Sequence, residues 1–234
     1  MNKLTLGQIQ LKPGVILLSA SLLLVVFRYF GYPQSFVSIF HTACGTDFKN
    51  CLPAHIYFFL CSVLLLMLLP FVLIKYFLKE KISDYGLKKG DFKFGMTSFL
   101  ILAPLIALVL LLPSSRMPEF RAEYPLFALA GKAFSLVLLY ELLYGLYYIS
   151  WEFFFRGYLL FGLKDIFGEW NAIMIQTLPS VLMHIGKPVG ETLASVAAGI
   201  LFGKLALRGK SIYYVFLLHW FIGMALDLFI LYLK

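Results

Sequence analysis

Long apolar stretches, separated by short polar and basic segments, dominate the chain. A membrane-spanning helix needs about 20 predominantly apolar residues, and seven stretches qualify as candidate spans. They lie at about residues 14–31, 55–78, 96–112, 130–163, 170–186, 190–207 and 211–233. The pattern therefore predicts an all-α fold, a polytopic membrane helix bundle of about seven spans.

Composition agrees with a membrane protein. Of the 234 residues, 61% are hydrophobic and only 14% are charged, and the mean hydropathy is +0.87. A soluble domain carries about 25% charged residues. Lys3 and Lys12 precede the first apolar run, but Arg28 and Tyr29 follow it, with no small-residue cleavage site. We expect an uncleaved first span rather than a signal peptide.

The net charge of +8 does not indicate nucleic-acid binding, because the basic residues lie between apolar runs rather than on one amphipathic surface. Such residues set membrane topology instead. With the N-terminus inside, twelve Lys and Arg lie inside and seven lie outside. The inner set is Lys3, Lys12, Lys75, Lys79, Lys81, Lys88, Lys89, Lys93, Lys164, Lys204, Arg208 and Lys210, and the outer set is Arg28, Lys49, Arg116, Arg121, Lys132, Lys187 and Lys234. We expect the N-terminus inside and the C-terminus outside.

This topology places Cys44 and Cys51 in the first outer loop, where two such close thiols can form a disulfide; two free thiols are the alternative. Cys61 falls inside the second span. In the sixth span, Ser195, Gly199 and Gly203 are spaced by four. They give one smooth helix face that another helix can approach closely.

Several ionisable residues fall within the apolar stretches. Each costs about 2.5–3.5 kcal/mol in the bilayer and normally faces the protein interior, where it serves function. Glu152 and Arg156 are four residues apart, on one helix face,. At 1.5 Å per residue, Glu152, His184 and His219 lie about 16, 21 and 12 Å from the inner ends of their spans. The three therefore share a level near the membrane's middle, whereas Glu141 lies near the outer surface.

Such a group can support hydrolysis. A carboxylate in a cavity of low dielectric constant can take a proton from water. Histidines can polarise a carbonyl group, donate to an oxyanion or bind a metal. Each residue has a structural alternative, since a single His can be a helix-bundle hydrogen bonder. The Glu152–Arg156 pair can likewise serve only to set helix register.

These residues resemble the motifs of the CPBP family, the CAAX prenyl proteases and bacteriocin-processing proteins. The segment EFFFRG, with Glu152 and Arg156, is similar to the end of the family's EExxxR motif. Ser180 and His184 resemble the second motif, and His219 the third. The loop SDYGLKKGDF at 83–92 resembles a segment that precedes the family core. We therefore expect residues 1–79 to form two N-terminal spans with an outer loop, and residues 80–234 to form the CPBP-like core.

The resemblance implies an intramembrane endopeptidase that cleaves membrane-associated or lipidated peptides by glutamate-activated water. Glu152, His184 and His219 are then the catalytic residues, and Arg156 orients Glu152. It also implies a multi-pass protein of a bacterial plasma membrane, with membrane lipid and a peptide or lipidated protein as partners. A divalent metal such as zinc stays open, and the sequence requires none. The oligomeric state is not predicted.

Two positions depart from the family pattern. Trp151 replaces the first motif glutamate, the usual base, and Gly223 stands where a polar residue follows His219. Glu191 and Asp227 are candidates to support Glu152, and Lys187 is a candidate orienting residue. The alternatives are a non-catalytic family member that binds a membrane peptide, with an immunity or scaffold role, and a small transporter with a polar midplane site.

Overall fold

The computed structural model describes residues 6–40 and 44–233. No strand occurs in that part of the chain. Helices labelled η are 3-10 or π turns. The elements are α1 (Leu6–Phe30), α2 (Pro33–Phe40), η1 (Phe48–Asn50), α3 (Leu52–Val63), η2 (Leu64–Leu68), α4 (Leu69–Val72), η3 (Leu73–Leu78), η4 (Ile82–Tyr85), α5 (Phe92–Ile106), η5 (Ala107–Leu111), α6 (Leu112–Ser114), α7 (Pro118–Glu123), η6 (Ala130–Lys132), α8 (Phe134–Glu152), η7 (Phe153–Phe161), α9 (Gly162–Phe167), α10 (Glu169–Leu182), α11 (Val189–Gly209) and α12 (Tyr213–Tyr232).

Six helical stretches among the described residues are long and apolar enough to cross a membrane. They are Leu11–Phe30, Leu52–Leu78, Phe92–Ser114, Phe134–Phe167, Val189–Gly209 and Tyr213–Tyr232. They confirm the prediction of an all-α polytopic membrane bundle.

The span expected at 170–186 is shorter than a full crossing. It forms α10, which has 14 residues and a length of about 21 Å, against about 30 Å for the hydrocarbon core. The helix ends at Leu182 because the chain then turns back. Gly186 has a positive φ of 101°, and Pro188 directly precedes α11.

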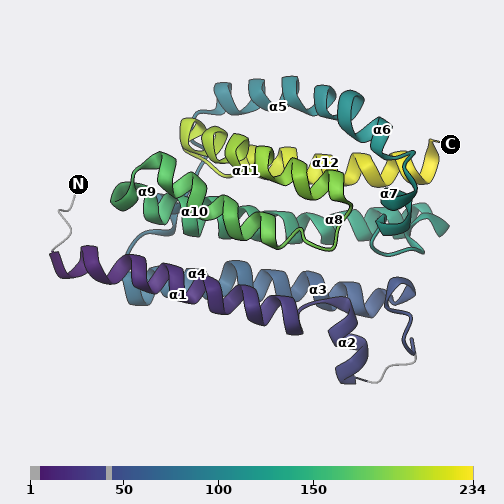
Figure 1. Cartoon of the computed structure of the whole chain (residues 1–234), viewed down its shortest axis with the longest axis horizontal. Coiled ribbons are helices and arrows are strands. Elements are labelled where there is room, and N and C mark those ends of the chain that lie inside the picture. The colour runs from purple at the N-terminus through teal and green to yellow at the C-terminus, as the bar shows by residue number, and fades with distance from the viewer. Residues whose placement is uncertain (1–5, 41–43, 234) are drawn as a thin grey trace.

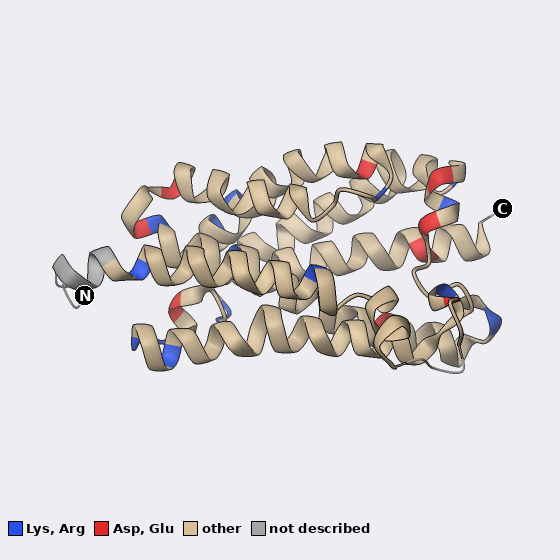
Figure 2. Ribbon diagram, turned by 60° about the horizontal axis from the view of Figure 1, so that its bottom comes forward, with Lys and Arg blue, Asp and Glu red and all other residues tan. Residues whose placement is uncertain are grey.

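The long helices run in alternating directions, so the two ends of the chain lie at opposite ends of the bundle (Figure 1). α3 packs on α8, and α12 packs on both α8 and α5. Figure 2 shows Lys, Arg, Asp and Glu gathered mostly toward the two ends, with a largely uncharged zone between them. This distribution is the one a bilayer requires of a multi-pass protein.

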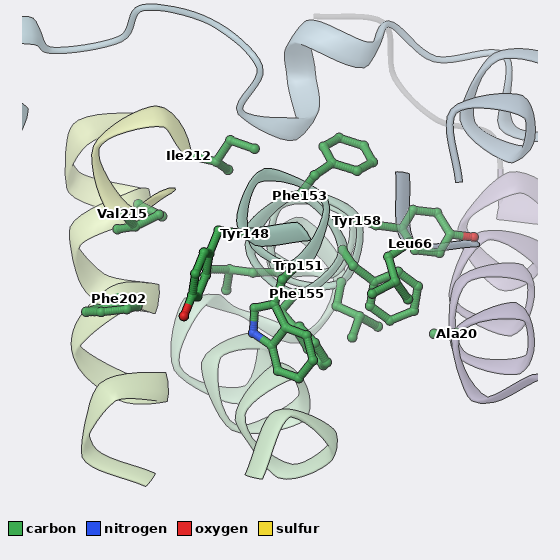
Figure 3. Close-up of a cluster of buried hydrophobic side chains, with 14 of the residues drawn as sticks. Ala20, Leu66, Tyr148, Trp151, Phe153, Phe155, Tyr158, Phe202, Ile212 and Val215 are labelled. Atoms are coloured by element: carbon green, nitrogen blue, oxygen red, sulfur yellow. The ribbon is translucent and has the colours of Figure 1, made fainter. Parts of the chain in front are cut away.

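The helix formed by α8 and η7 lies at the centre of the core. All nine residues of η7 are buried, and Figure 3 shows buried side chains around this helix, with α1 on one side and Val215 and Phe202 on the other. η7 is a π-helix that begins directly after Glu152. Such widened turns are rare and occur frequently at functional sites.

The smooth face expected on the sixth span packs against α10. A Cβ atom at Gly199 would lie 2.6 Å from the side chain of Thr177, and one at Gly203 would lie 3.1 Å from Ile173. Gln176 also donates a hydrogen bond of 2.9 Å to the carbonyl oxygen of Gly199. The small residues therefore bring α10 and α11 close enough for side chain to meet backbone.

The N-terminal part packs directly on the rest of the bundle. Ile16 and Leu66 share one hydrophobic core with Phe153 and Leu163. The division into residues 1–79 and 80–234 stays a prediction. In the first loop, Cys44 and Cys51 form a disulfide with their Cα atoms 5.7 Å apart.

Candidate functional site

A buried carboxylate links the central helix to α12. Glu152 is fully buried at the end of α8, and its Oε1 lies 2.6 Å from Nδ1 of His219. Its Oε2 lies 3.2 Å from Nε of Arg156, one turn further on. The angle of this second contact is outside hydrogen-bond geometry, so it is an ion pair. Arg156 is 2% exposed, and each of these two buried charges needs the other.

A cavity of about 150 Å³ lies beside this group. His184 and His219 are both in its wall, together with Glu191, Lys187 and Tyr124. Glu152, Arg156 and Asp227 are not among the lining residues. The Glu152 carboxylate therefore reaches the cavity through the ring of His219.

Hydrogen bonds determine which ring nitrogen of each cavity histidine carries the proton and which one can accept a hydrogen bond. Nδ1 of His184 lies 2.7 Å from the carbonyl oxygen of Ser180. A carbonyl oxygen only accepts, so Nδ1 carries the proton and Nε2 is an acceptor in the neutral ring. The same reasoning applies to His219, whose Nδ1 faces the Glu152 carboxylate,. In its neutral form, each of the two histidines that line the cavity thus keeps a lone pair on Nε2,.

The two departures from the family motifs have different surroundings: Trp151 is in the cavity wall, whereas Gly223 lies against Tyr148, a wall residue. The Trp151 side chain is 2% exposed and lines the cavity. Its ring packs edge-on against His184, with centroids 5.5 Å apart, and 4.6 Å from Phe155. An indole ring, whose buried Nε1–H group has no hydrogen-bond partner among the described residues, therefore stands where the motif has its first glutamate. At Gly223, a Cβ atom would come into contact with the hydroxyl oxygen of Tyr148.

Polar side chains connect three segments in the cavity wall. Nζ of Lys187 lies 3.0 Å from Oε1 of Glu123 and donates a 3.0 Å hydrogen bond to the hydroxyl of Tyr124. That hydroxyl donates to Glu191 at 2.7 Å. Burial raises the pKa of the Tyr124 hydroxyl well above its usual range, so it stays a donor at neutral pH,. Lys187 and Glu191 are therefore linked through Tyr124.

Asp227 lies apart from this cavity. It is fully buried in α12, close to Glu141 of α8. None of the four carboxylate oxygens of this pair has a hydrogen-bond partner with adequate geometry among the described residues. The position of Glu141 along its span predicted a place near the outer surface and did not predict this buried pair.

Whether the site can hold a metal ion depends on which metal-ligating side chains it contains. Within the residues that the structure describes, no group of three or more His, Cys, Asp or Glu side chains is placed to hold a metal ion. Zinc sites in proteins use three or four such ligands, so we derive no step through a metal.

The order and spacing of these residues agree with a known family. Residues 133–225 match the family model described as Type II CAAX prenyl endopeptidase Rce1-like. This segment is Rce1-like. The match confirms, for this segment, the resemblance to the CAAX prenyl proteases. The Rce1-like segment extends from the start of α8 into α12, so it contains Glu152, Arg156, His184 and His219. No curated protein and no solved structure matched the chain.

Sequence reasoning did not select Tyr148, Tyr124 or Glu123, although all three line the cavity. Tyr is abundant, with 14 in the chain, and it is common at membrane interfaces. Nothing in the sequence distinguishes these tyrosines from the others. Glu123 belongs to a connecting segment, whose position over the cavity only the fold shows.

Proposed function

We propose that this Rce1-like membrane protein is an intramembrane endopeptidase that cleaves membrane-associated or lipidated peptides. The contact between Glu152 and His219 beside a cavity is the observation that supports the proposal most strongly. A carboxylate that accepts from Nδ1 of a histidine orients the ring and stabilises its protonated form. Nε2 of His219 then acts as a base toward the cavity.

In the proposed reaction, a water molecule attacks the carbonyl carbon of the scissile peptide bond. One water proton passes to Nε2 of His219, and the carbonyl π electrons move to the oxygen to give a tetrahedral oxyanion. Collapse of this intermediate breaks the C–N bond, and the leaving amine takes the proton from His219. Glu152 thus acts on water through His219, because its carboxylate does not line the cavity.

Arg156 and His184 have supporting roles in this proposal. Arg156 contacts the Oε2 atom of Glu152 while His219 contacts Oε1, so the two side chains together hold the carboxylate in position. His184 presents its Nε2 to the same cavity and can accept a hydrogen bond from the substrate amide or from the attacking water.

A second candidate function is the binding of a membrane peptide without cleavage. Trp151 favours it, because an indole ring in the cavity wall provides apolar contact area but no base. Gly223 favours it as well, because no side chain there can contact the reacting group.

The deciding experiment uses purified protein in detergent with a library of farnesylated and unmodified membrane peptides, with and without a chelator. Wild type is compared with Glu152→Gln, His219→Ala and Trp151→Glu. Cleavage by wild type that both of the first two variants lose supports the endopeptidase. Binding in all proteins, with cleavage gained only by Trp151→Glu, would support the peptide-binding function instead. Loss of cleavage with chelator would show that a metal takes part.

A further inference from the structure

Gly223 and the side chain of Tyr148 lie next to each other in the structure. Gly223 lies one helical turn after His219 in α12, and Tyr148 lies one turn before Glu152 in α8. A Cβ atom at Gly223 would come into contact with the Tyr148 hydroxyl oxygen and would lie 2.7 Å from Cζ of the same ring. Any side chain at position 223 would therefore need the space that the phenol group of Tyr148 fills.

Tyr148 also lies against the proposed catalytic base. Its ring centroid is 4.7 Å from that of His219, and the side chain lines the cavity while only 5% exposed. Figure 3 shows Tyr148 on the side of the central helix that faces Phe202 of α11 and Val215 of α12. The tyrosine is thus held between α8 and α12 beside the base.

An oxyanion that forms beside His219 needs a hydrogen-bond donor. A developing oxyanion is stabilised by N–H or O–H groups. The neutral rings of His184 and His219 carry their protons on Nδ1, which the Ser180 carbonyl and the Glu152 carboxylate bind. Neither ring presents an N–H group to the cavity before the base is protonated. A phenol hydroxyl is both donor and acceptor, and its proton can turn toward the oxyanion.

We propose that Tyr148 is a catalytic residue whose hydroxyl donates a hydrogen bond to the oxyanion of the tetrahedral intermediate. It takes the place of the polar side chain that the family motif has at the position of Gly223. The inference rests on the proposed endopeptidase function. The glycine is then explained as the change that makes room for the tyrosine.

The first test is Tyr148→Phe, which removes the hydroxyl and keeps the ring. We expect kcat to fall about 10²–10³-fold, the usual effect of losing one oxyanion donor, with KM changed less than about threefold, since the donor acts in the transition state. Tyr158→Phe is the matched control. Tyr158 is a buried tyrosine of the same long helix, and its hydroxyl contacts Ser19 rather than the cavity. A Tyr148→Phe protein with nearly wild-type kcat would overturn the proposal.

The second test exchanges the two positions. Tyr148→Ala opens the space beside Gly223, and the double variant Tyr148→Ala/Gly223→Asn puts a polar side chain there. We expect the double variant to be at least about tenfold more active than Tyr148→Ala alone, because an amide N–H again faces the oxyanion. A role of Tyr148 in packing only would predict no recovery.

A binding measurement separates failure of this inference from failure of the proposed function. A peptide phosphinate, whose phosphorus oxygens mimic the tetrahedral intermediate, is compared with the same peptide carrying a ketomethylene group. We expect Tyr148→Phe to weaken phosphinate binding about tenfold and to leave ketomethylene binding unchanged. If wild type cleaves no peptide, the endopeptidase is refuted and the assignment of Tyr148 falls with it. If wild type cleaves peptides but Tyr148→Phe does not weaken phosphinate binding selectively, only the assignment of Tyr148 is overturned. Equal loss for both ligands overturns the assignment.

Discussion

Oε1 of Glu152 and Nδ1 of His219 lie 2.6 Å apart, although the two residues are 67 positions apart in the chain. The contact joins the end of α8 to the first half of α12. The Glu152 carboxylate does not line the cavity, but through this contact it is the partner of the His219 ring, which does. This geometry is the basis for assigning the proton transfer to His219 and the supporting negative charge to Glu152.

Replacement of Glu152 by Gln should lower kcat by about 10²–10⁴-fold, because an amide cannot stabilise a protonated His219 and can favour the wrong tautomer. KM should change little. The measurement is steady-state cleavage of the best peptide from the library. Glu141→Gln is the matched control, since Glu141 is a buried carboxylate of the same helix that does not line the cavity. Equal losses in both variants would contradict the assignment.

The ion pair between Glu152 and Arg156 should be detectable in thermal stability. Arg156→Met removes one of two buried charges, and breaking such a pair typically costs about 3–5 kcal/mol because the other charge is left uncompensated. We expect a clear fall in the Tm of the detergent-solubilised protein. Glu152→Gln/Arg156→Met should recover part of that loss. A double variant less stable than Arg156→Met would show that the pair is not the cause.

The disulfide between Cys44 and Cys51 closes a short loop. Chain-entropy arguments give about 2 kcal/mol for a loop of this length. Cys44→Ser/Cys51→Ser should therefore unfold at a lower temperature than wild type, and a reducing agent should lower the Tm of wild type but not of the double variant. Cys61→Ser is the control, because Cys61 is a free thiol. Insensitivity of wild type to reduction would contradict the prediction.

Close packing of α10 on α11 should make Gly199 sensitive to a single methyl group. Gly199→Ala places a Cβ atom 2.6 Å from the Thr177 side chain, and such overpacking typically costs about 1–3 kcal/mol. Gly190→Ala on the same helix is the control, since its nearest neighbour would be 4.0 Å away. Thermal unfolding of the two variants gives the comparison. Identical Tm values would show that the helices can separate without cost.

The orientation in the membrane stays a proposal: N-terminus inside, C-terminus outside. The excess of Lys and Arg on one side supports it, and the two ends of the chain lie at opposite ends of the bundle (Figure 1). A phosphatase reporter that is active only outside the cytoplasm should therefore be active when fused to the C-terminus. The same reporter fused within residues 79–93, on the basic inner side, should be inactive.

Much of the architecture could be predicted from local pattern. Apolar stretches of sufficient length predict membrane helices wherever they occur, and six of the seven predicted spans are long enough in the structure. The exception is α10, which ends at Leu182, shortly before the turn at Gly186. The length of an apolar stretch does not show where its helix stops, because turns such as the one after Leu182 depend on neighbouring helices.

The sequence predicted that the polar motif residues come near one another, but it predicted neither their orientation nor the tyrosines that line the cavity. Spacing on one helix brings Glu152 to Arg156, and depth brings Glu152 near His219, since both follow from the fixed rise of an α-helix. The direction in which each side chain points depends on the rotation of its helix, which packing against other helices determines. That rotation puts Trp151 rather than Glu152 in the cavity wall.

The sequence by itself determined that this is a helical membrane protein, because a bilayer admits few polar groups and the long apolar stretches satisfy that limit. Its motifs also carried the resemblance to the Rce1-like family. Only the tertiary structure decided that Glu152 contacts His219, that Lys187 and Glu191 are linked through Tyr124, and that the Tyr148 phenol group fills the space at Gly223. These contacts join segments that are distant in the chain. Their existence depends on how whole helices pack, and no local pattern encodes that packing.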